Sequence, residues 1–274
     1  GSKKGMTLIA GITINPPTPK FPTSGFYIGG GSVVIIGCKV EHKEQETITG
    51  FSARGNSQVF ISYSTAINCN PGFISWTPKG MSLRHCSSYG NENGTGFVSA
   101  DKGILEADTC LAENHFRGFH SIGDSTMHLN NSTASGNTNE GKVASSRSRL
   151  EARNSTAIRN GKTGFKCVGH SQMKLQNCRS TKNEGHGFRS FGSASLTGFT
   201  CFASENGGCG FISQVASEMH LIKCHATSNV KDGFKSDPEK AVYFATTAKL
   251  LYLKDCKVGN KKLNGYVTAK DSIR

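Results

Sequence analysis

The stretch ENGGCGFISQVASEMHLIKCHATSNVKDGF, residues 205–234, begins and ends on nearly the same motif, a polar turn with Asn followed by Gly-Phe. The motif recurs along the chain, and from Phe165 to Phe188 and on to Phe211 the aromatic residue returns every 23 positions. A fixed internal period of this size predicts a repeat architecture. The aromatic positions that follow a glycine are Phe26, Phe51, Phe73, Phe97, Phe119, Phe165, Phe188, Phe211, Phe234 and Tyr266.

One repeat has a lysine in place of the aromatic residue. Lys142 follows Gly141, midway between Phe119 and Phe165. A charged amine is costly inside an apolar column. We expect a one-residue slip in the preceding turn, which turns Val143 inward and Lys142 outward. The alternative is that Lys142 keeps the register and its amine reaches the edge of the coil.

Other positions repeat in step with the aromatic residue. Asparagine stands five residues before it at Asn68, Asn114, Asn137, Asn160, Asn183, Asn206 and Asn229. Small residues stand ten before it at Ser132, Ser155, Cys178, Cys201, Cys224 and Cys256, with Cys86 and Cys110 displaced by one. The apolar runs between them are short and alternate with period two, which indicates strands. Such small units bury their apolar sides only by stacking, so we predict an all-β solenoid of about ten coils, each of about 23 residues with three short strands.

The motif C-x-A-x-x-N followed by G-F-x-S, as in CHATSNVKDGFKS, resembles the repeats of the pectate-lyase-like superfamily. The resemblance covers about residues 26–270 and implies a right-handed parallel β-helix. Members of that superfamily include polysaccharide lyases, hydrolases, esterases and epimerases, as well as proteins that use the coil as an interaction platform. The resemblance therefore implies the fold and leaves the activity open.

The chain divides into a leading strand or coil over residues 1–25 and β-helix repeats over residues 26–274, with a longer loop expected near residues 236–247. We expect Gly1 and Ser2 to be the remnant of an expression tag. Open coil ends expose unpaired strand edges, so we also expect the chain to be a piece of a longer protein.

The ten cysteines point to a reducing environment. Cys178, Cys201 and Cys224 share one column in consecutive repeats, where three thiols cannot all pair. Serine fills the same column at Ser132 and Ser155, so we expect small, buried, reduced thiols rather than a disulfide ladder. This favours a reducing intracellular compartment such as the cytoplasm, although a secreted protein stays open if the native start is missing. Apolar runs long enough for membrane insertion do not occur.

The charge indicates the kind of partner. The chain has 32 basic and 19 acidic residues, and 32 − 19 gives a net charge of +13, which favours an anionic ligand. Alternation along the Gly-Phe-x-Ser strand points the residue after the aromatic outward, and more cations stand just before that strand. The alternative is that these cations only keep a sheet surface soluble. The predicted ligand-binding residues are Arg117, His120, Lys142, Lys162, Lys166, His186, Arg189, Lys231 and Lys235.

Catalysis is the second hypothesis. A lyase or epimerase acting on uronates needs a base and a cation that neutralises the carboxylate, and the candidates of the right type are Lys166, His186, Arg189 and Lys235. Only Asp232 and Glu184 are acids near them, so we predict no cofactor, with calcium relevant only to a lyase. Hydrolases are disfavoured because adjacent repeats do not place acids at matching outward positions.

Metal and nucleic-acid sites are also disfavoured. C-x-x-C pairs do not occur, and the histidines fall in different columns, so we predict no metal site. The aromatic residues needed to stack on bases point inward, which makes nucleic acid an unlikely partner. The sequence therefore predicts a rigid platform that binds an acidic polysaccharide or an acidic protein surface, with a polysaccharide lyase or epimerase as the alternative.

Overall fold

The protein is described here by a computed structural model that covers residues 5–16, 24–43, 48–237, 251–259, 261–267 and 272–273. Every regular element within these ranges is a β-strand. The same ranges contain no helix that is long and apolar enough to cross a membrane. Most of the longer loop predicted near residues 236–247 lies outside the described residues.

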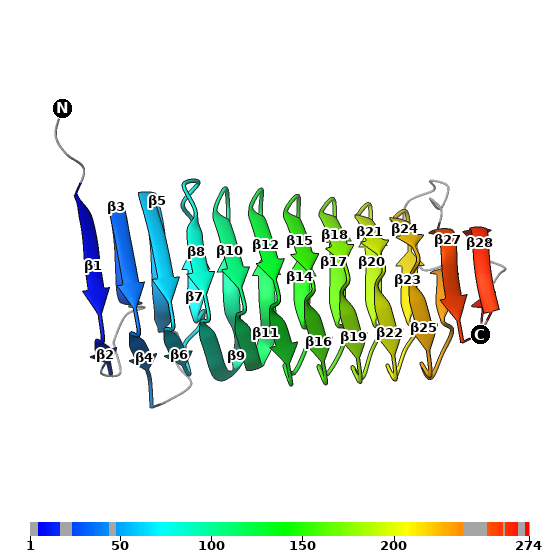
Figure 1. Ribbon diagram of the computed structural model, residues 1–274, viewed down its shortest axis with the longest axis horizontal. Helices are drawn as coiled ribbons and strands as arrows, with labels where there is room; N and C mark the ends of the chain where they lie inside the picture. The colour runs from blue at the N-terminus through cyan, green and yellow to red at the C-terminus, as the bar shows by residue number, and fades with distance from the viewer. Residues whose placement is uncertain are drawn as a thin grey trace.

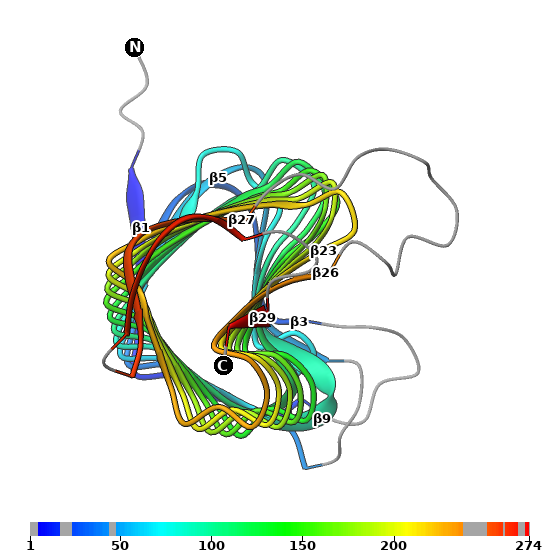
Figure 2. The same cartoon turned by 90° about the vertical axis from the view of Figure 1, so that its right-hand side faces the viewer.

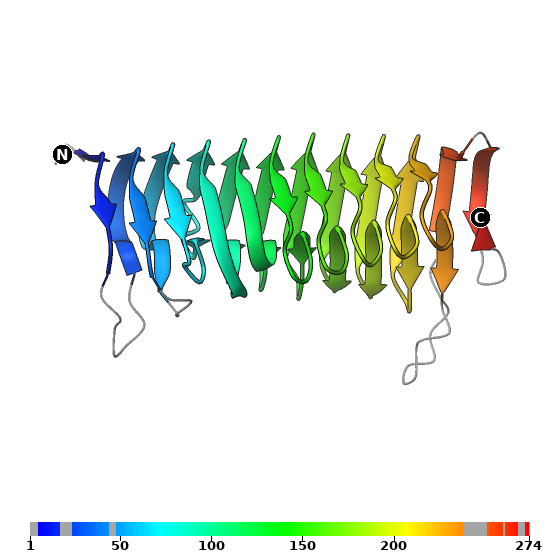
Figure 3. The same ribbon diagram turned by 90° about the horizontal axis from the view of Figure 1, so that it is seen from below.

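The strands wind into a rod of stacked coils, which runs from blue to red in Figures 1 and 3. Each strand pairs in parallel with its counterpart one coil later, as Phe165 does with Phe188 and Met173 with Leu196. A coil crosses three sheets in turn, which we name the Phe sheet, the Met sheet and the Ala sheet after their inward residues. This confirms the predicted parallel β-solenoid.

The three sheets share some strands, because β3, β5, β9, β11 and β27 turn a corner and contribute to two of them. The Met sheet contains β1 (Met6–Ala10), β3 (Ser24–Ile36), β5 (Thr49–Ser62), β8 (Met81–Arg84), β10 (Ile104–Asp108), β12 (Thr126–Asn130), β15 (Arg149–Arg153), β18 (Gln172–Gln176), β21 (Ser195–Phe199), β24 (Glu218–Ile222) and β27 (Leu251–Val258). The Ala sheet contains β2 (Thr13–Ile14), β4 (Lys39–Glu41), β6 (Thr65–Ile67), β9 (Ser87–Ser99), β11 (Leu111–Ser121), β13 (Thr133–Ser135), β16 (Thr156–Ile158), β19 (Arg179–Thr181), β22 (Phe202–Ser204), β25 (His225–Thr227) and the end of β27. The Phe sheet contains the starts of β3 and β5, then β7 (Phe73–Ser75), the ends of β9 and β11, β14 (Lys142–Ala144), β17 (Phe165–Gly169), β20 (Phe188–Gly192), β23 (Phe211–Gln214) and β26 (Phe234–Asp237).

The core is a column of stacked phenylalanine rings inside the Phe sheet. The rings from Phe26 to Phe119 and from Phe165 to Phe234 follow one another with centres 4.7–5.0 Å apart. This spacing matches the distance between neighbouring strands, so each ring packs on its copy in the next coil. The predicted aromatic column is confirmed over these repeats.

The repeat with Lys142 keeps its register. Lys142 pairs with Phe119 and Phe165 and is fully buried, so the predicted slip is wrong. The preceding turn has no freedom to slip, because the main-chain N–H of Asn137 donates to Asn160 Oδ1 at 3.2 Å and fixes the turn. Val143 therefore lies on the outer face of the sheet, where neighbouring residues cover it to 3% exposure.

A buried ladder of asparagine amides runs along the turn between the Ala and Phe sheets. Its members are Asn137, Asn160, Asn183, Asn206 and Asn229, and each Nδ2 donates to the next Oδ1 at 2.8–2.9 Å. Asn68 and Asn114 were predicted in the same column, and this is wrong. Both residues adopt positive φ and stand one position before the ladder position of their coil. In the coil of Asn114 the ladder position is held by His115, whose main-chain N–H donates to Asn137 Oδ1.

The last predicted aromatic position is also wrong. Tyr266 lies on β28 (Lys261–Val267), which pairs antiparallel with β27 and sets Tyr266 opposite Tyr252. The short strand β29 (Ser272–Ile273) pairs antiparallel with β26. The parallel pattern therefore changes after β27, and glycine before an aromatic residue is not enough to mark another coil.

The cysteines are small buried residues, as predicted. All ten are free and buried. In the shared column, the thiols of Cys178 and Cys224 donate to main-chain carbonyls of the preceding coil, at 3.4 Å to Ala152 and 3.6 Å to Gly198. The side chain of this column also accepts a main-chain N–H, from Cys201 to Cys224 Sγ and from Ser132 to Ser155 Oγ, which explains why Ser and Cys alternate there.

Candidate functional site

The predicted basic residues lie on and beside the outer face of the Phe sheet. Its outer column runs through His120, Val143, Lys166, Arg189 and Ile212, and then Lys235. In the end-on view of Figure 2, the outline of the coil bends inward at β23 and β26, between two rows of turns that bulge outward. This concave course explains why the column is half-buried rather than freely exposed.

The remaining predicted residues occupy other surroundings. Arg117 lies on β11, and Lys162, His186 and Lys231 lie in the turns that precede the Phe-sheet strands. His186 Nδ1 accepts the main-chain N–H of Cys209 at 3.0 Å.

Two of the predicted cations line a hollow in the surface. Lys231 and Lys235 line it together with Asp232, and its volume is about 570 Å³. Burial removes Lys142 from any surface. The role of the other predicted residues in binding a ligand stays a prediction.

Glu140 is a buried acid among these cations that sequence reasoning did not single out. Its carboxylate is 3% exposed and accepts hydrogen bonds from Arg117 Nε at 3.0 Å and from Lys166 Nζ at 2.5 Å. Burial alone would raise the pKa of Glu140, but the hydrogen bonds and charges of Lys166 and Arg117 outweigh it and hold the pKa below its usual value. Glu140 is therefore ionised at neutral pH.

Burial in this face also lowers the pKa values of His120 and Arg189. Burial and the charge of Arg117 lower the pKa of His120 from 6.5 to about 4, so its ring is neutral at pH 7. Its Nε2 lies 2.8 Å from Ser145 Oγ. Burial also lowers the pKa of Arg189 below its ordinary value, and the negative charge of Glu140 partly offsets this.

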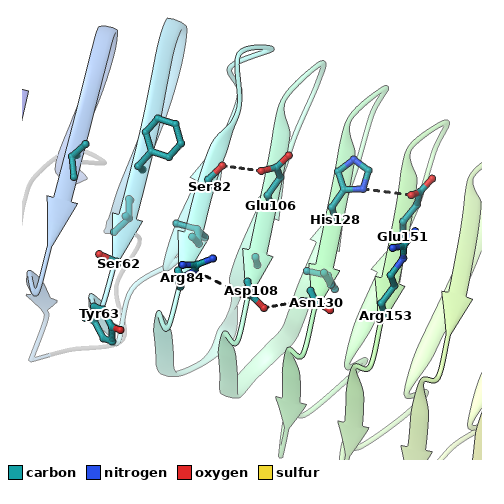
Figure 4. A pocket seen from close by; sticks show the side chains of 16 residues that line it. Ser62, Tyr63, Ser82, Arg84, Glu106, Asp108, His128, Asn130, Glu151 and Arg153 are labelled. Atoms are coloured by element: carbon teal, nitrogen blue, oxygen red, sulfur yellow. Dashed lines mark hydrogen bonds and ion pairs between the residues drawn. The ribbon is translucent and has the colours of Figure 1, made fainter. Parts of the chain in front are cut away.

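A larger hollow lies on a different face, the outer side of the Met sheet. It is an open groove of about 890 Å³ that crosses strands from β3 to β15 (Figure 4). Its polar side chains stand in two rows because alternate residues of each strand point outward. One row is Ser82, Glu106, His128 and Glu151, and the other is Arg84, Asp108, Asn130 and Arg153.

The three acids of the groove each have a protein donor or a cation beside them. Ser82 Oγ donates to Glu106 Oε2 at 2.9 Å, and His128 Nδ1 lies 3.6 Å from Glu151 Oε2. Asp108 accepts from Asn130 Nδ2 at 3.0 Å.

The two arginines of the groove differ in their partners. Arg84 lies 3.7 Å from Asp108 through its Nε, with 69% of its side chain exposed. Arg153 is exposed, and no hydrogen bond or ion pair joins its side chain to another described residue. The positive charge that the groove leaves open to a ligand is therefore that of Arg153, supplemented by the exposed part of Arg84.

The end of the groove over β3 and β5 is apolar. Val34, Phe60 and Tyr63 line it, and Phe60 and Tyr63 are 40% and 64% exposed. The ring of Tyr63 stacks on that of His85 with centres 4.9 Å apart. An exposed aromatic face beside polar groups is suited to the apolar face of a sugar ring or another flat ligand.

Sequence reasoning missed this groove. None of the site residues predicted from the sequence lines the groove. In the groove, neighbouring coils do not place acids at matching positions, but Glu106 and Asp108 stand on the same strand. The signal was the run of charged and polar residues in two outward rows over four coils, while the apolar residues that close one end carry no such mark.

A metal site is not formed by the described residues, since no three or more His, Cys, Asp or Glu side chains among them are grouped to hold an ion. The acids of the groove are instead held by hydrogen-bond donors and cations. Calcium would need several free carboxylate or carbonyl oxygens around one point.

Comparisons with known proteins agree with the architecture. A family described as "Right handed beta helix region" matches residues 95–258. The periplasmic alginate epimerase AlgG superimposes with a TM-score of 0.67 at 13% identity, over 89% of this chain and 64% of that one. The A-module of the Azotobacter vinelandii mannuronan C-5 epimerase AlgE4 gives a TM-score of 0.65 at 13% identity, over 86% of this chain and 72% of that one.

The likeness to these epimerases is one of fold, because the identity is low. A mutant of the periplasmic enzyme is matched over 62% of its length, so this chain spans less than two thirds of that protein. No curated protein matches the chain.

Proposed function

This chain belongs to the right-handed β-helix family, and from that premise we propose that it binds a polysaccharide carrying carboxylates along the groove of the Met sheet. The observation that carries the proposal is the open groove of about 890 Å³ that crosses successive coils and holds the unpartnered Arg153. A polymer laid across the strands meets a new set of side chains at each coil, at intervals of about 4.8 Å. The alginate epimerases of the same fold, which act on a polysaccharide, support this ligand class.

The chemistry of the groove supports an acidic sugar rather than a neutral one. Each acid of the groove has a hydrogen-bond donor or a cation beside it, so its oxygens are already engaged within the protein. Arg153 and the exposed part of Arg84 are suited to a carboxylate, because a guanidinium donates two parallel hydrogen bonds to it. Hydroxyl groups of the neighbouring sugars would meet Asn130, His128 and Glu106. The net charge of +13 favours the encounter with a polyanion.

The test is a binding measurement with matched acidic and neutral oligosaccharides. Calorimetry with oligouronates and with their carboxyl-reduced analogues should show binding of the acidic form only. Arg153→Gln should weaken that binding at least about tenfold, since a hydrogen bond to a charged group contributes roughly 1.5–3 kcal/mol. Arg179→Gln is the matched control, because Arg179 is an exposed arginine on the Ala sheet.

The proposal is refuted by equal binding of the neutral analogues, by an unchanged affinity of Arg153→Gln, or by an equal loss in the Arg179→Gln control. Binding of an acidic protein with no binding of any oligosaccharide would also contradict it.

Catalysis on the same polymer is the second candidate, and the position of His128 favours it. His128 lies in the middle of the groove, in contact with Glu151 and one strand from Arg153. Proton removal next to a uronate carboxylate needs a base and a cation that neutralises the carboxylate. His128 would supply the base and Arg153 the cation. Lyase chemistry would also release the group attached to the neighbouring carbon, whereas epimerisation would return a proton to the opposite face.

The two candidates are separated by product analysis. Incubation with uronans is followed by ultraviolet absorbance for unsaturated ends and by NMR for epimerised units. Turnover that His128→Ala abolishes, with binding retained, supports catalysis. Binding without any product supports a platform.

A further inference from the structure

The concave outer face of the Phe sheet holds more positive charge than its acid can balance. Both oxygens of Glu140 are occupied, one by Arg117 Nε at 3.0 Å and the other by Lys166 Nζ at 2.5 Å. Arg189 follows Lys166 in the same outer column, one coil further along. Three cations therefore surround one buried carboxylate, and 3 − 1 leaves two positive charges without a balancing acid among the described residues.

Arg189 is the cation whose side chain has no hydrogen-bond acceptor among the described residues. Its Nε is buried without a hydrogen bond in the described part of the chain, and its guanidinium carbon lies 5.0 Å from the ring centre of Phe191. A buried N–H that finds no acceptor costs free energy, so the described residues leave the guanidinium of Arg189 incompletely compensated. Burial lowers the pKa of Arg189, which is consistent with a guanidinium that lacks a hydrogen-bond acceptor.

The surroundings strengthen the attraction for an anion. In the outer column, Val143 precedes Lys166 and Ile212 follows Arg189, and they are 3% and 2% exposed, so an apolar side chain borders the two cations at each end. Lys166 and Arg117 keep 23% and 31% of their side chains exposed. Charges at a partly dehydrated surface interact more strongly than charges in bulk water. His120 is neutral at pH 7 and adds a polar ring without adding charge.

We propose that Arg189, Lys166 and Arg117, held around Glu140, form a second binding site for a compact oxyanion such as a carboxylate, sulfate or phosphate group. Arg189 would contribute the charge of its guanidinium, and Lys166 would contribute its charge from the neighbouring coil. The site lies on the Phe sheet, whereas the groove lies on the Met sheet, so its existence does not depend on the function proposed above. The oxyanion belongs either to a free small anion or to a substituent of a larger ligand.

The test uses inorganic sulfate and phosphate as probes at constant ionic strength, with chloride as the reference. Saturable binding, seen by calorimetry and as a rise in melting temperature, is expected for sulfate and phosphate. Arg189→Met should weaken binding at least tenfold. Arg179→Met on the Ala sheet and Arg153→Gln in the groove should leave it unchanged. If Arg189→Met does not fold, Lys166→Met serves as the second variant.

The sulfate and phosphate measurements test the site on the Phe sheet independently of the groove on the Met sheet. Absence of saturable binding in the wild type, or equal affinity in Arg189→Met and Lys166→Met, overturns the proposal. Loss of sulfate binding in Arg153→Gln also overturns it, because the anion would then occupy the groove. Binding of a sulfated or uronate oligosaccharide, measured alongside, shows whether the oxyanion is a free small anion or a substituent of a larger ligand. Either result supports the site.

Discussion

The side-chain nitrogen of Lys142 lies 5.2 Å from the ring centre of Phe119, in the position where another ring would complete the phenylalanine stack. The ring of Phe165 lies 5.1 Å away on its other side. The amine donates to the main-chain carbonyls of Ser132, at 3.1 Å, and Thr156. The stack is thus interrupted by a polar group that the coil must satisfy from its own backbone.

Replacing Lys142 by Met should stabilise the protein, most strongly at pH 6–7. Burial lowers the pKa of Lys142 from 10.5 to about 7. Between these values the unfolded chain binds the proton and the folded chain does not, so wild-type stability rises with pH from about 7 to 10.5. Below pH 7 the folded protein holds a buried charge. Its free energy of unfolding is therefore lower there than above pH 10.5, by several kcal/mol. Urea unfolding at pH 6, 8 and 9.5 should show the advantage of Lys142→Met shrinking as pH rises.

The control for this variant is Lys174→Met, because Lys174 is exposed on the Met sheet. It should not change the pH dependence of stability. Lys142→Phe provides a second check, since it adds two ring contacts of about 0.5–1.5 kcal/mol each. A variant less stable than the wild type at pH 6 would contradict this account.

Asn183→Ala should destabilise the protein by about 2–4 kcal/mol. Asn183 Oδ1 accepts the side-chain and main-chain N–H groups of Asn160 at 2.8 and 3.0 Å, and its Nδ2 donates to Asn206 Oδ1 at 2.9 Å. The substitution leaves these buried groups without partners. Thermal and urea unfolding measure the effect, and Gln176→Ala on the exposed side of β18 is the control. Equal stability of the two variants would show that the ladder adds little.

Cys201→Ser should be tolerated, with a loss of no more than about 1 kcal/mol. Ser132 and Ser155 already fill this column, and Ser155 Oγ accepts a main-chain N–H there as Cys224 Sγ does. Cys201→Leu should cost about 1–3 kcal/mol by overpacking the corner. Unfolding curves of both variants decide this, together with intact mass under non-reducing conditions. A mixed disulfide in the wild type would contradict the picture of free thiols, and the reducing compartment itself stays a prediction.

Glu140→Gln should destabilise the protein by about 2–3 kcal/mol at pH 7, because it leaves Arg117 and Lys166 without their shared acid. The folded-state pKa of Glu140 lies below its ordinary value of 4.5, so its contribution is present above about pH 4.5 and is lost as pH falls through the folded pKa. Stability measured from pH 3 to 7 should therefore fall more in the wild type than in Glu140→Gln. Parallel curves would mean that Glu140 is not held ionised by its two cations.

The period of the sequence was enough to predict the fold. Phe165, Phe188 and Phe211 repeat at a distance that only stacking explains, and the inward positions followed from strand alternation. Exceptions to the period were predicted poorly. The turn before Lys142 kept its register because a hydrogen-bonded ladder fixes it, and the energy of such a ladder is not visible in the spacing of residues. His115 in place of Asn114 is the same kind of error.

The candidate sites depend on depth and on partners, which a period does not encode. The outward orientation of Lys166 and Arg189 was predictable from the alternation, but the acid between the cations, Glu140, comes from a turn and was missed. The two polar rows of the groove were visible in the sequence, but the apolar residues that close one end, such as Phe60 and Tyr63, carry no mark that sets them apart. An outward residue such as Arg153 gains importance only when its neighbours are seen to offer it no partner.

Parallel pairing of each coil with an equivalent one makes the length of the rod adjustable in whole coils. Residues 172–194 form one such coil, and Gln172 and Ser195 occupy equivalent places at its two borders. Excising this coil would bring Leu150 against Leu196, Asn160 against Asn206 and Phe165 against Phe211. The leucine, asparagine and phenylalanine stacks would therefore each continue across the junction. The excised segment contains Arg189 and lies beyond the groove, which ends at Arg153. Whole-coil deletion therefore offers a shorter molecule with an intact groove, and the two surfaces can be gained, lost or moved apart along the axis as separate modules.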